Sequence, residues 1–302
     1  MTSLVVQLFP AVIVFLLLML ATGLLIITRR ISRRGRRSPL TSDLLRNPGE
    51  SLREQVEELS SDLISNLLFF ILILCLIAIQ FLLQERTDPQ ANTMSLMITY
   101  GLISVGGVLF FIFQEVRIFR KRQLLRLGLE CELAVGQQLN QLMLLGCRVY
   151  HDFPAEGFNI DHIVIGPAGV YAVETKGRAK PDKGGGTEEA LVVYDGKGLQ
   201  FPGWSETKPI AQAKRQAQWL ENWLKSAVGE SVTVLPALAL PGWYIDRKAR
   251  NMAVFNAKNP DFLAKGNGEV KLTEAMIQRV AHQVELRCRT VEPVSYGKKK
   301  GK

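Results

Sequence analysis

Three long apolar segments in the first 113 residues limit most strongly what this chain can fold into. They cover residues 4–28, 67–83 and 93–113, and none of them contains Asp, Glu, Lys or Arg. A helix needs about 20 apolar residues to cross the hydrocarbon core of a bilayer. The sequence therefore predicts three transmembrane helices, of which the second and third form a hairpin, and it excludes a uniform water-soluble globule.

The distribution of Lys and Arg predicts how these helices are oriented. Six Arg lie within residues 29–37, five Lys or Arg lie within residues 117–126, and the loop at 84–92 holds only Arg86. Because cytoplasmic loops carry the excess of basic residues, we expect a multi-pass protein of a bacterial inner membrane, with its N-terminus outside and its soluble domain in the cytoplasm. Anionic lipid is the expected contact of the basic clusters, and nucleic acid is the alternative.

The apolar and basic segments divide the chain into five parts. These are a transmembrane helix at 1–28, a basic linker with an amphipathic helix at 29–65, a transmembrane hairpin at 66–113, a soluble domain at 114–290 and a basic tail at 291–302. We expect the amphipathic helix, at about 43–65, to lie at the inner membrane surface, and its continuation into the second span is left open. The net charge of +9 permits a polyanionic partner without requiring one. Four Cys without CxxC spacing and three His exclude a zinc finger or a disulfide framework.

Apolar periodicity in the soluble part predicts an α/β domain with one mixed sheet. Helices are expected at 124–145, 209–228 and 273–288, with Thr273 as an N-cap, and strands at 147–151, 160–165, 170–176, 191–194, 199–201, 232–240 and 252–256.

The chemically informative part of this domain is a predicted β-hairpin. The apolar segments 160–165 and 170–176 are separated by Gly166-Pro167-Ala168-Gly169, which is a sequence typical of a tight turn. If Ile165 pairs with Val170, this one pair determines the partner of every other residue in the two strands. A slip of one residue would turn every side chain to the other face.

This register places two carboxylates opposite each other. Asp161 stands across from Glu174 on one face, and Lys176 lies on that face too, because side chains alternate with a period of two. Directly opposed like charges destabilise a sheet unless one carboxyl holds a proton or a cation lies between them. Two hard carboxylates suit Mg²⁺ or Mn²⁺, which activates water for attack on a phosphodiester. The alternative is that all three are exposed polar positions and that no ligand binds.

The same residues resemble those of a known family. The run at 160–171, Glu174-x-Lys176, Glu132 in the preceding helix and Pro209-x-x-Gln212-Ala213 are similar to motifs of the NERD (nuclease-related) domain, over about 128–240. The resemblance implies a restriction-endonuclease-like, PD-(D/E)XK mixed-sheet fold that follows the N-terminal transmembrane helices.

The resemblance also implies roles for five residues. Asp161 and Glu174 would be metal ligands for Mg²⁺ or Mn²⁺, and Lys176 the catalytic lysine. Glu132 would be an acidic helper and Gln212 a polar contact from the second helix.

Several neighbouring side chains have a structural interpretation instead. His162 alternates to the face opposite Asp161, so we expect it in the core, and the sequence names no partner for His151. Trp219 and Trp223 fit packing better than base stacking. Gln216 shares their helix stripe with Gln212, and the sequence leaves open whether this glutamine pair faces the site.

The sequence as a whole indicates a membrane-anchored, metal-dependent nuclease-like protein that acts on nucleic acid, with DNA ahead of RNA. Two alternatives stay open at this stage. One is a tethered module that binds nucleic acid or protein without cleaving it, since fold does not imply function. The other makes the membrane part a sensor or scaffold that the soluble domain regulates. The sequence gives no oligomeric state.

Overall fold

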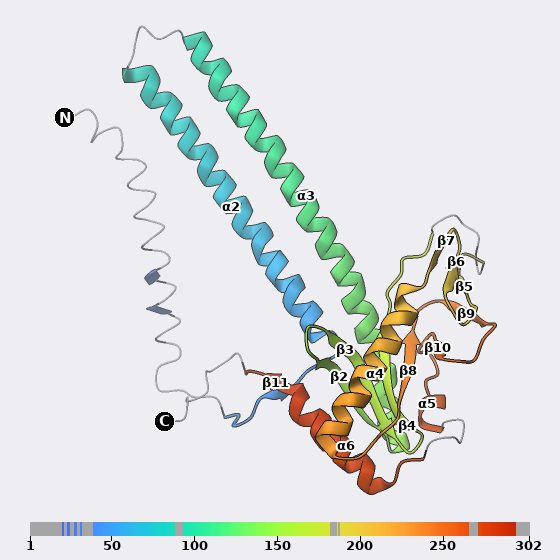
Figure 1. The fold of residues 1–302 in the computed structure, drawn as a ribbon. Coiled ribbons are helices and arrows are strands. Elements are labelled where there is room, and N and C mark those ends of the chain that lie inside the picture. Colours follow the sequence, from blue (N-terminus) through green and yellow to red (C-terminus); the bar gives the residue numbers. More distant parts are fainter. Residues whose placement is uncertain are drawn as a thin grey trace. The chain divides into compact units, whose positions relative to one another are not determined.

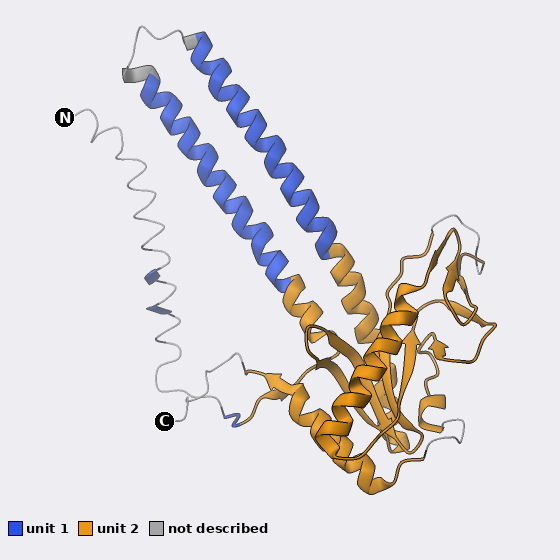
Figure 2. Cartoon of the chain, viewed as in Figure 1, with its two compact units in different colours: residues 1–41, 57–122, 293–302 blue, residues 42–56, 123–292 orange. Residues whose placement is uncertain are grey.

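The structure is a computed structural model, and it describes residues 20, 23–24, 27–28, 31, 39–87, 93–181, 186, 188–265 and 271–293. Most of the predicted first transmembrane helix and the Lys-rich end of the basic tail lie outside the described residues. The chain divides into two compact units (Figure 2). The first comprises residues 1–41, 57–122 and 293–302, and the second comprises residues 42–56 and 123–292.

The first unit contains most of two long helices, α2 (Glu50–Thr87) and α3 (Thr93–Asn140). Both are long and apolar enough to cross a membrane, and they contain the predicted spans 67–83 and 93–113. Phe70 and Phe111 stack between the helices, with ring centroids 4.2 Å apart.

The second unit is built on a five-stranded mixed sheet with the strand order β10-β8-β4-β3-β2. Its strands are β2 (Arg148–Pro154), β3 (Asn159–Gly166), β4 (Gly169–Thr175), β8 (Val234–Ala239) and β10 (Ala253–Phe255). β2, β3 and β4 are antiparallel neighbours, whereas β8 runs parallel to β4 and to β10. The α/β class predicted from the sequence is confirmed.

Helices cover both faces of this sheet (Figure 1). On one face, α4 (Lys208–Val228) and α6 (Glu274–Cys288) bury Leu220, Leu224 and Val280 against Ile163 and Ile165. The opposite face packs against the end of α3, the 3-10 helix η1 (Gln141–Leu145) and α5 (Phe262–Lys265). As predicted, α6 starts at an N-cap Thr, Thr273, whose side chain accepts from the Met276 N–H.

A second sheet of four strands corrects the expectation of one mixed sheet. It contains β7 (Trp204–Glu206), β6 (Leu199–Phe201), β5 (Leu191–Tyr194) and β9 (Tyr244–Arg247), in that order, and a 3-10 turn, η2 (Glu188–Ala190), precedes it. The strands predicted at 191–194 and 199–201 belong here and not to the central sheet. Both edges of β4 are already hydrogen-bonded to β3 and β8, and the second sheet has its own core around Tyr194, Phe201 and Trp243.

The segment before α2 also departs from the prediction. We expected an amphipathic helix at about 43–65, but β1 (Leu44–Leu45) pairs with β11 (Arg289–Val291), and the helix starts only at Glu50. Asn47 fixes this start, because its side-chain amide donates to the Glu50 carboxylate at 3.0 Å and its backbone N–H donates at 3.4 Å. This resembles a capping box. Residues 42–56 therefore fold with the second unit.

Candidate functional site

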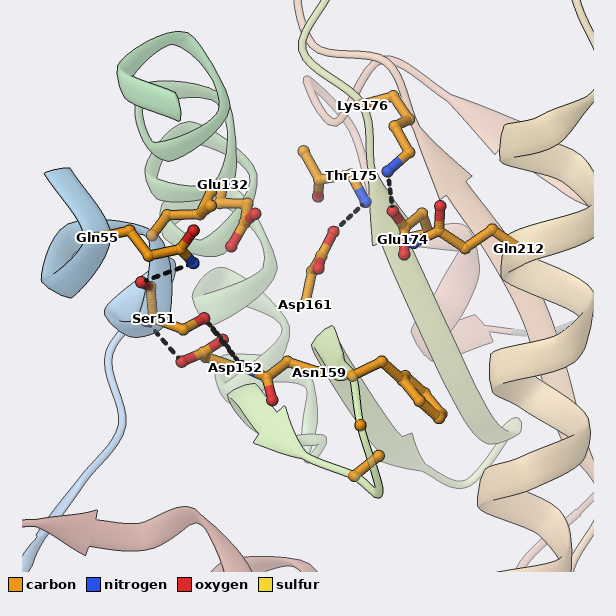
Figure 3. Close-up of a pocket in the computed structure, with 14 residues that line it drawn as sticks. Ser51, Gln55, Glu132, Asp152, Asn159, Asp161, Glu174, Thr175, Lys176 and Gln212 are labelled. Atoms are coloured by element: carbon orange, nitrogen blue, oxygen red, sulfur yellow. Dashed lines mark hydrogen bonds and ion pairs between the residues drawn. The ribbon is translucent and has the colours of Figure 1, made fainter. Parts of the chain in front are cut away.

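A polar pocket of about 530 Å³ lies in the second unit (Figure 3). It is lined by side chains from the start of α2, from α3, from the β2–β4 strands and their loops, and from α4. The lining residues are Ser51, Leu52, Gln55, Glu132, Asp152, Ala155, Gly157, Phe158, Asn159, Asp161, Glu174, Thr175, Lys176 and Gln212. All five residues singled out in the sequence are among them.

The hairpin of β3 and β4 has the register that the sequence predicted. Ile165 pairs with Val170, and the ladder keeps the same register as far as His162 and Val173, so the predicted pair of Asp161 and Glu174 falls just beyond its last pair. Gly169 has a φ of 117°, in the region that favours glycine, so the tight turn depends on this residue. One residue beyond the ladder, Asp161 Oδ2 accepts the Thr175 N–H at 2.6 Å.

Glu174 and Lys176 meet on the same side of the hairpin. One carboxylate oxygen of Glu174, Oε1, is ion-paired with Lys176 Nζ. The other oxygen, Oε2, is buried and has no hydrogen-bond partner within the part of the chain that the structure describes. Because Glu174 is only 1% exposed, this oxygen has lost its water without gaining a donor. Such a group is costly unless a ligand fills the gap.

Glu132 and Gln212 approach the hairpin carboxylates from two different helices. Glu132 extends from α3 and is buried, with 8% of its surface exposed. Gln212 comes from α4 on the other side of Asp161 and Glu174 (Figure 3). The pocket thus has three carboxyl groups near its centre.

Burial and mutual repulsion favour protonated carboxyls here. The pKa of Asp161 is raised well above its usual value, first by burial and then by Glu174 and Glu132, against the lowering effects of the Thr175 N–H and Lys176. The pKa of Glu132 is raised to about 8, first by burial and then by Asp152 and Glu174. Without a cation, the pocket therefore cannot keep all of its carboxyl groups ionised at neutral pH.

The donor set fits a hard divalent cation. Asp161 and Glu174 offer carboxylate oxygens, and the unpartnered Oε2 of Glu174 is a free acceptor. Within the described residues, no group of three His, Cys, Asp or Glu side chains is arranged to hold a metal ion. Mg²⁺ differs from zinc in this respect, because it keeps several waters and takes only one or two carboxylates from the protein. The residues present therefore fit Mg²⁺ or Mn²⁺ and do not fit a fully protein-ligated metal.

A comparison with protein families finds one match in this part of the chain. Residues 127–241 match the model of the nuclease-related domain. The match contains Glu132, the hairpin and Gln212, and it supports a nuclease-related domain in this chain. No curated protein and no solved structure matches the chain. The compact second unit is larger than the matched segment, because it adds residues 42–56 before it and β10, α6 and β11 after it.

A buried histidine pair lies in the central sheet, where His151 of β2 is opposite His162 of β3. His162 is fully buried, as expected, and its Nδ1 lies 2.9 Å from Nδ1 of His151, the partner that the sequence could not name. His151 Nε2 lies 2.9 Å from Asn140 Oδ1, and His162 Nε2 lies 3.2 Å from Thr175 Oγ1. Burial lowers the pKa of His151 to about 4 and that of His162 well below its usual value, so both rings are neutral at pH 7.

Which atoms donate and which accept in this series of hydrogen bonds follows from the first acceptor, the Asn140 side chain. If the Asn140 carbonyl accepts from His151 Nε2, then His151 Nδ1 accepts from His162, and His162 Nε2 accepts from the Thr175 hydroxyl. Thr175 is therefore held through its side chain while its N–H holds Asp161.

Three further α4 side chains, Gln216, Trp219 and Trp223, pack within the protein and do not line the pocket. Gln216 is buried and donates to the Asn159 carbonyl at 3.2 Å, and it does not line the pocket. Trp219 and Trp223 pack edge-to-face against Phe153, with centroids 6.3 and 5.1 Å away. This agrees with packing and not with a base-stacking platform.

Sequence reasoning missed several residues of the pocket wall. Asp152 is 2% exposed, has a φ of 48° and accepts hydrogen bonds from Arg46, Ser51 and Asn159. Its position directly after a predicted strand was the only available signal. Ser51 and Gln55 gave none, because they precede a transmembrane segment and reach the pocket only through tertiary structure.

Proposed function

We propose that the chain is a membrane-anchored, divalent-metal-dependent nuclease that hydrolyses phosphodiester bonds in nucleic acid, with DNA ahead of RNA. The match to the nuclease-related domain supports a nuclease-like function. The observation that carries the proposal is the meeting of Asp161, Glu174 and Lys176 in one pocket, where a buried Glu174 oxygen has no partner among the described residues. The Asp161, Glu174-x-Lys176 pattern is that of the PD-(D/E)XK nucleases.

Asp161 and Glu174 would hold Mg²⁺ or Mn²⁺. When bound, such an ion lowers the pKa of a water molecule and neutralises charge on the scissile phosphate. Lys176, which is paired with Glu174 in the structure, would stabilise the negative charge that develops on the phosphate. Glu132, a buried carboxyl of the same pocket wall, would accept or return a proton. Gln212 would donate its amide N–H to a phosphate oxygen.

The proposal also includes the membrane. The two apolar helices α2 and α3 would anchor the protein as a hairpin. The basic clusters after residues 28 and 113 support a cytoplasmic nuclease-related domain in a bacterial inner membrane, with the N-terminus outside.

A cleavage assay with the full chain in detergent tests this function. Labelled DNA and RNA are incubated with Mg²⁺, with Mn²⁺ or with EDTA. We expect metal-dependent cleavage that Asp161→Asn and Glu174→Gln each reduce by at least roughly 100-fold. Glu130→Gln is the matched control, because Glu130 lies near Glu132 on α3 but is exposed and is ion-paired with Arg126.

Two results would contradict the proposal. One is activity in EDTA equal to that in Mg²⁺. The other is equal activity in Asp161→Asn and Glu130→Gln. Oligonucleotide binding without any cleavage would instead favour a tethered binding module.

A further inference from the structure

One wall of the pocket comes from outside the segment that matches the nuclease-related domain. Residues 42–56 contain β1, the turn that follows it and the start of α2, and three of these residues, Ser51, Leu52 and Gln55, line the pocket. We propose that this segment is part of the substrate-binding site and that Gln55 contacts the nucleic-acid backbone. The inference rests on the proposed function and deepens it by naming a binding residue.

The segment is held to the sheet by a buried carboxylate. Asp152, at the end of β2, accepts from Arg46 Nε at 2.8 Å and from Arg46 Nη2 at 2.6 Å. It also accepts from the Ser51 N–H at 2.8 Å and from the Ser51 hydroxyl at 2.6 Å. Hydrogen bonds between charged groups are among the strongest in proteins. Because Asp152 is 2% exposed and Arg46 13% exposed, these bonds are shielded from water and fix the first turn of α2 against β2.

Close packing against α3 holds the same segment from another side. A Cβ on Gly136 would lie 2.4 Å from Cγ of Pro48, so the two meet only because residue 136 is glycine. A Cβ on Gly49 would lie 2.6 Å from Leu129 Cδ1. Gly49 also has a φ of 67°, in the left-handed region that glycine adopts without strain. The turn before α2 is thus fitted to α3 at two points.

These attachments determine where Gln55 stands. It follows Ser51 by four residues, so the two side chains share one face of α2. The Gln55 Nε2 donates to the Ser51 carbonyl at 3.2 Å, and the side chain is otherwise exposed in the pocket wall. Figure 3 places Gln55 beside Glu132 on one side of the hairpin carboxylates and Gln212 on the other side. Two carboxamides therefore flank the acidic centre.

The charge of the pocket explains why a carboxamide suits this position. Four carboxyl side chains and one lysine line the pocket, and that lysine, Lys176, is already paired with Glu174. The described lining therefore offers a phosphate no unpaired positive charge. A glutamine amide donates a hydrogen bond to a phosphate oxygen and carries no charge of its own. Contacts to phosphates position nucleic acid irrespective of its sequence. The chemistry of Gln55 therefore points to the phosphodiester backbone and not to a base.

Binding of a fluorescein-labelled oligonucleotide to the full chain in detergent tests the inference. Fluorescence anisotropy in EDTA reports binding without cleavage. We expect Gln55→Ala to weaken binding roughly fivefold, which is the size of one neutral hydrogen bond. Gln55→Glu should weaken it further, because a carboxylate repels phosphate. Gln138→Ala is the matched control, since Gln138 is an exposed glutamine of α3 that does not line the pocket.

The outcomes separate this inference from the proposed function. Equal Kd values for wild type, Gln55→Ala and Gln138→Ala would overturn the role of Gln55 and leave the nuclease proposal standing. An absence of binding by the wild-type chain, with no cleavage in Mg²⁺ or Mn²⁺, would overturn both. Thermal unfolding of each variant checks that the fold is retained, and the conservative shape of Gln55→Glu keeps the comparison valid if the alanine variant is unstable.

Discussion

At the scale of single residues, the pocket is governed by acids that cannot all be ionised together. Burial and neighbouring carboxylates raise the pKa of both Asp161 and Glu132, and the only lysine in the wall is already paired with Glu174. A bound divalent cation would remove this conflict, since it favours the charged form of each ligand.

The raised pKa of Glu132 predicts how stability changes with pH. An ordinary unfolded glutamate releases its proton near pH 4.3, whereas Glu132 in the fold keeps it to about pH 8. The folded state therefore binds more protons between these values, and stability in EDTA should fall as pH rises from 5 to 8. Glu132→Gln should flatten this slope and raise the melting temperature at pH 8.

Thermal unfolding of the full chain at several pH values measures this effect. Glu130→Gln serves as the control, because that side chain is exposed on the same helix. The explanation would fail if Glu132→Gln were less stable than wild type at pH 8 and had the same slope.

The buried histidines predict a coupled loss of stability. His151→Phe leaves His162 Nδ1 without its hydrogen-bond partner, and His162→Phe leaves His151 Nδ1 without its own. Each change should lower the free energy of unfolding by about 1–3 kcal/mol. The double variant should lose less than the sum of the two, because both changes remove one shared hydrogen bond. Chemical denaturation measures all three, and strictly additive losses would speak against the network.

At the scale of elements, the hairpin could be predicted from the sequence and the segment at 42–56 could not. A four-residue turn and period-two alternation fix the register of β3 and β4 locally, so Asp161 and Glu174 could be paired by counting residues. The attachment of 42–56 depends on Asp152 and Gly136, which are far away in sequence, and its local pattern resembles an amphipathic helix. The second sheet was missed for a related reason: alternation identifies a strand but not its neighbours.

The fit between α3 and the turn before α2 predicts an unusual effect of a small substitution. Alanine normally stabilises a helix relative to glycine by about 1 kcal/mol. At Gly136, however, the added methyl would lie 2.4 Å from the rigid Pro48 ring, so the turn must move. Gly136→Ala should therefore lower the melting temperature and expose Arg46 to trypsin.

Gly128→Ala is the matched control on the same helix. Its Cβ would meet only the end of the Leu52 side chain, at 3.3 Å, which can rotate away. An increase in melting temperature for Gly136→Ala, equal to that of Gly128→Ala, would contradict the tight packing.

At the scale of the whole molecule, the described chain combines two apolar helices with a compact α/β unit, part of which matches the model of the nuclease-related domain. The unit is not one continuous stretch of sequence, because residues 42–56 and 123–292 both belong to it and most of the apolar hairpin lies between them. A fragment that starts after the hairpin would lack Arg46 and Ser51, and would leave Asp152 buried without these partners. Functional assays therefore require the full chain.

The proposed orientation predicts where reporters are active. A reporter that folds only in the cytoplasm should be active when it is fused after residue 302. The same reporter should be inactive when it is inserted at residues 88–92, because the proposed orientation, drawn from the distribution of Lys and Arg, puts this loop outside. Activity at the loop position and inactivity at the C-terminus would reverse the topology.

The central claim is that the two hairpin carboxylates bind a divalent cation together. Isothermal titration of Mn²⁺ into the full chain in detergent tests it most directly, alongside Asp161→Asn, Glu174→Gln and the control Glu130→Gln. We predict saturable binding that wild type and Glu130→Gln share and that the two hairpin variants lose. Binding that is unchanged in Asp161→Asn and Glu174→Gln, or absent from wild type, would contradict the account.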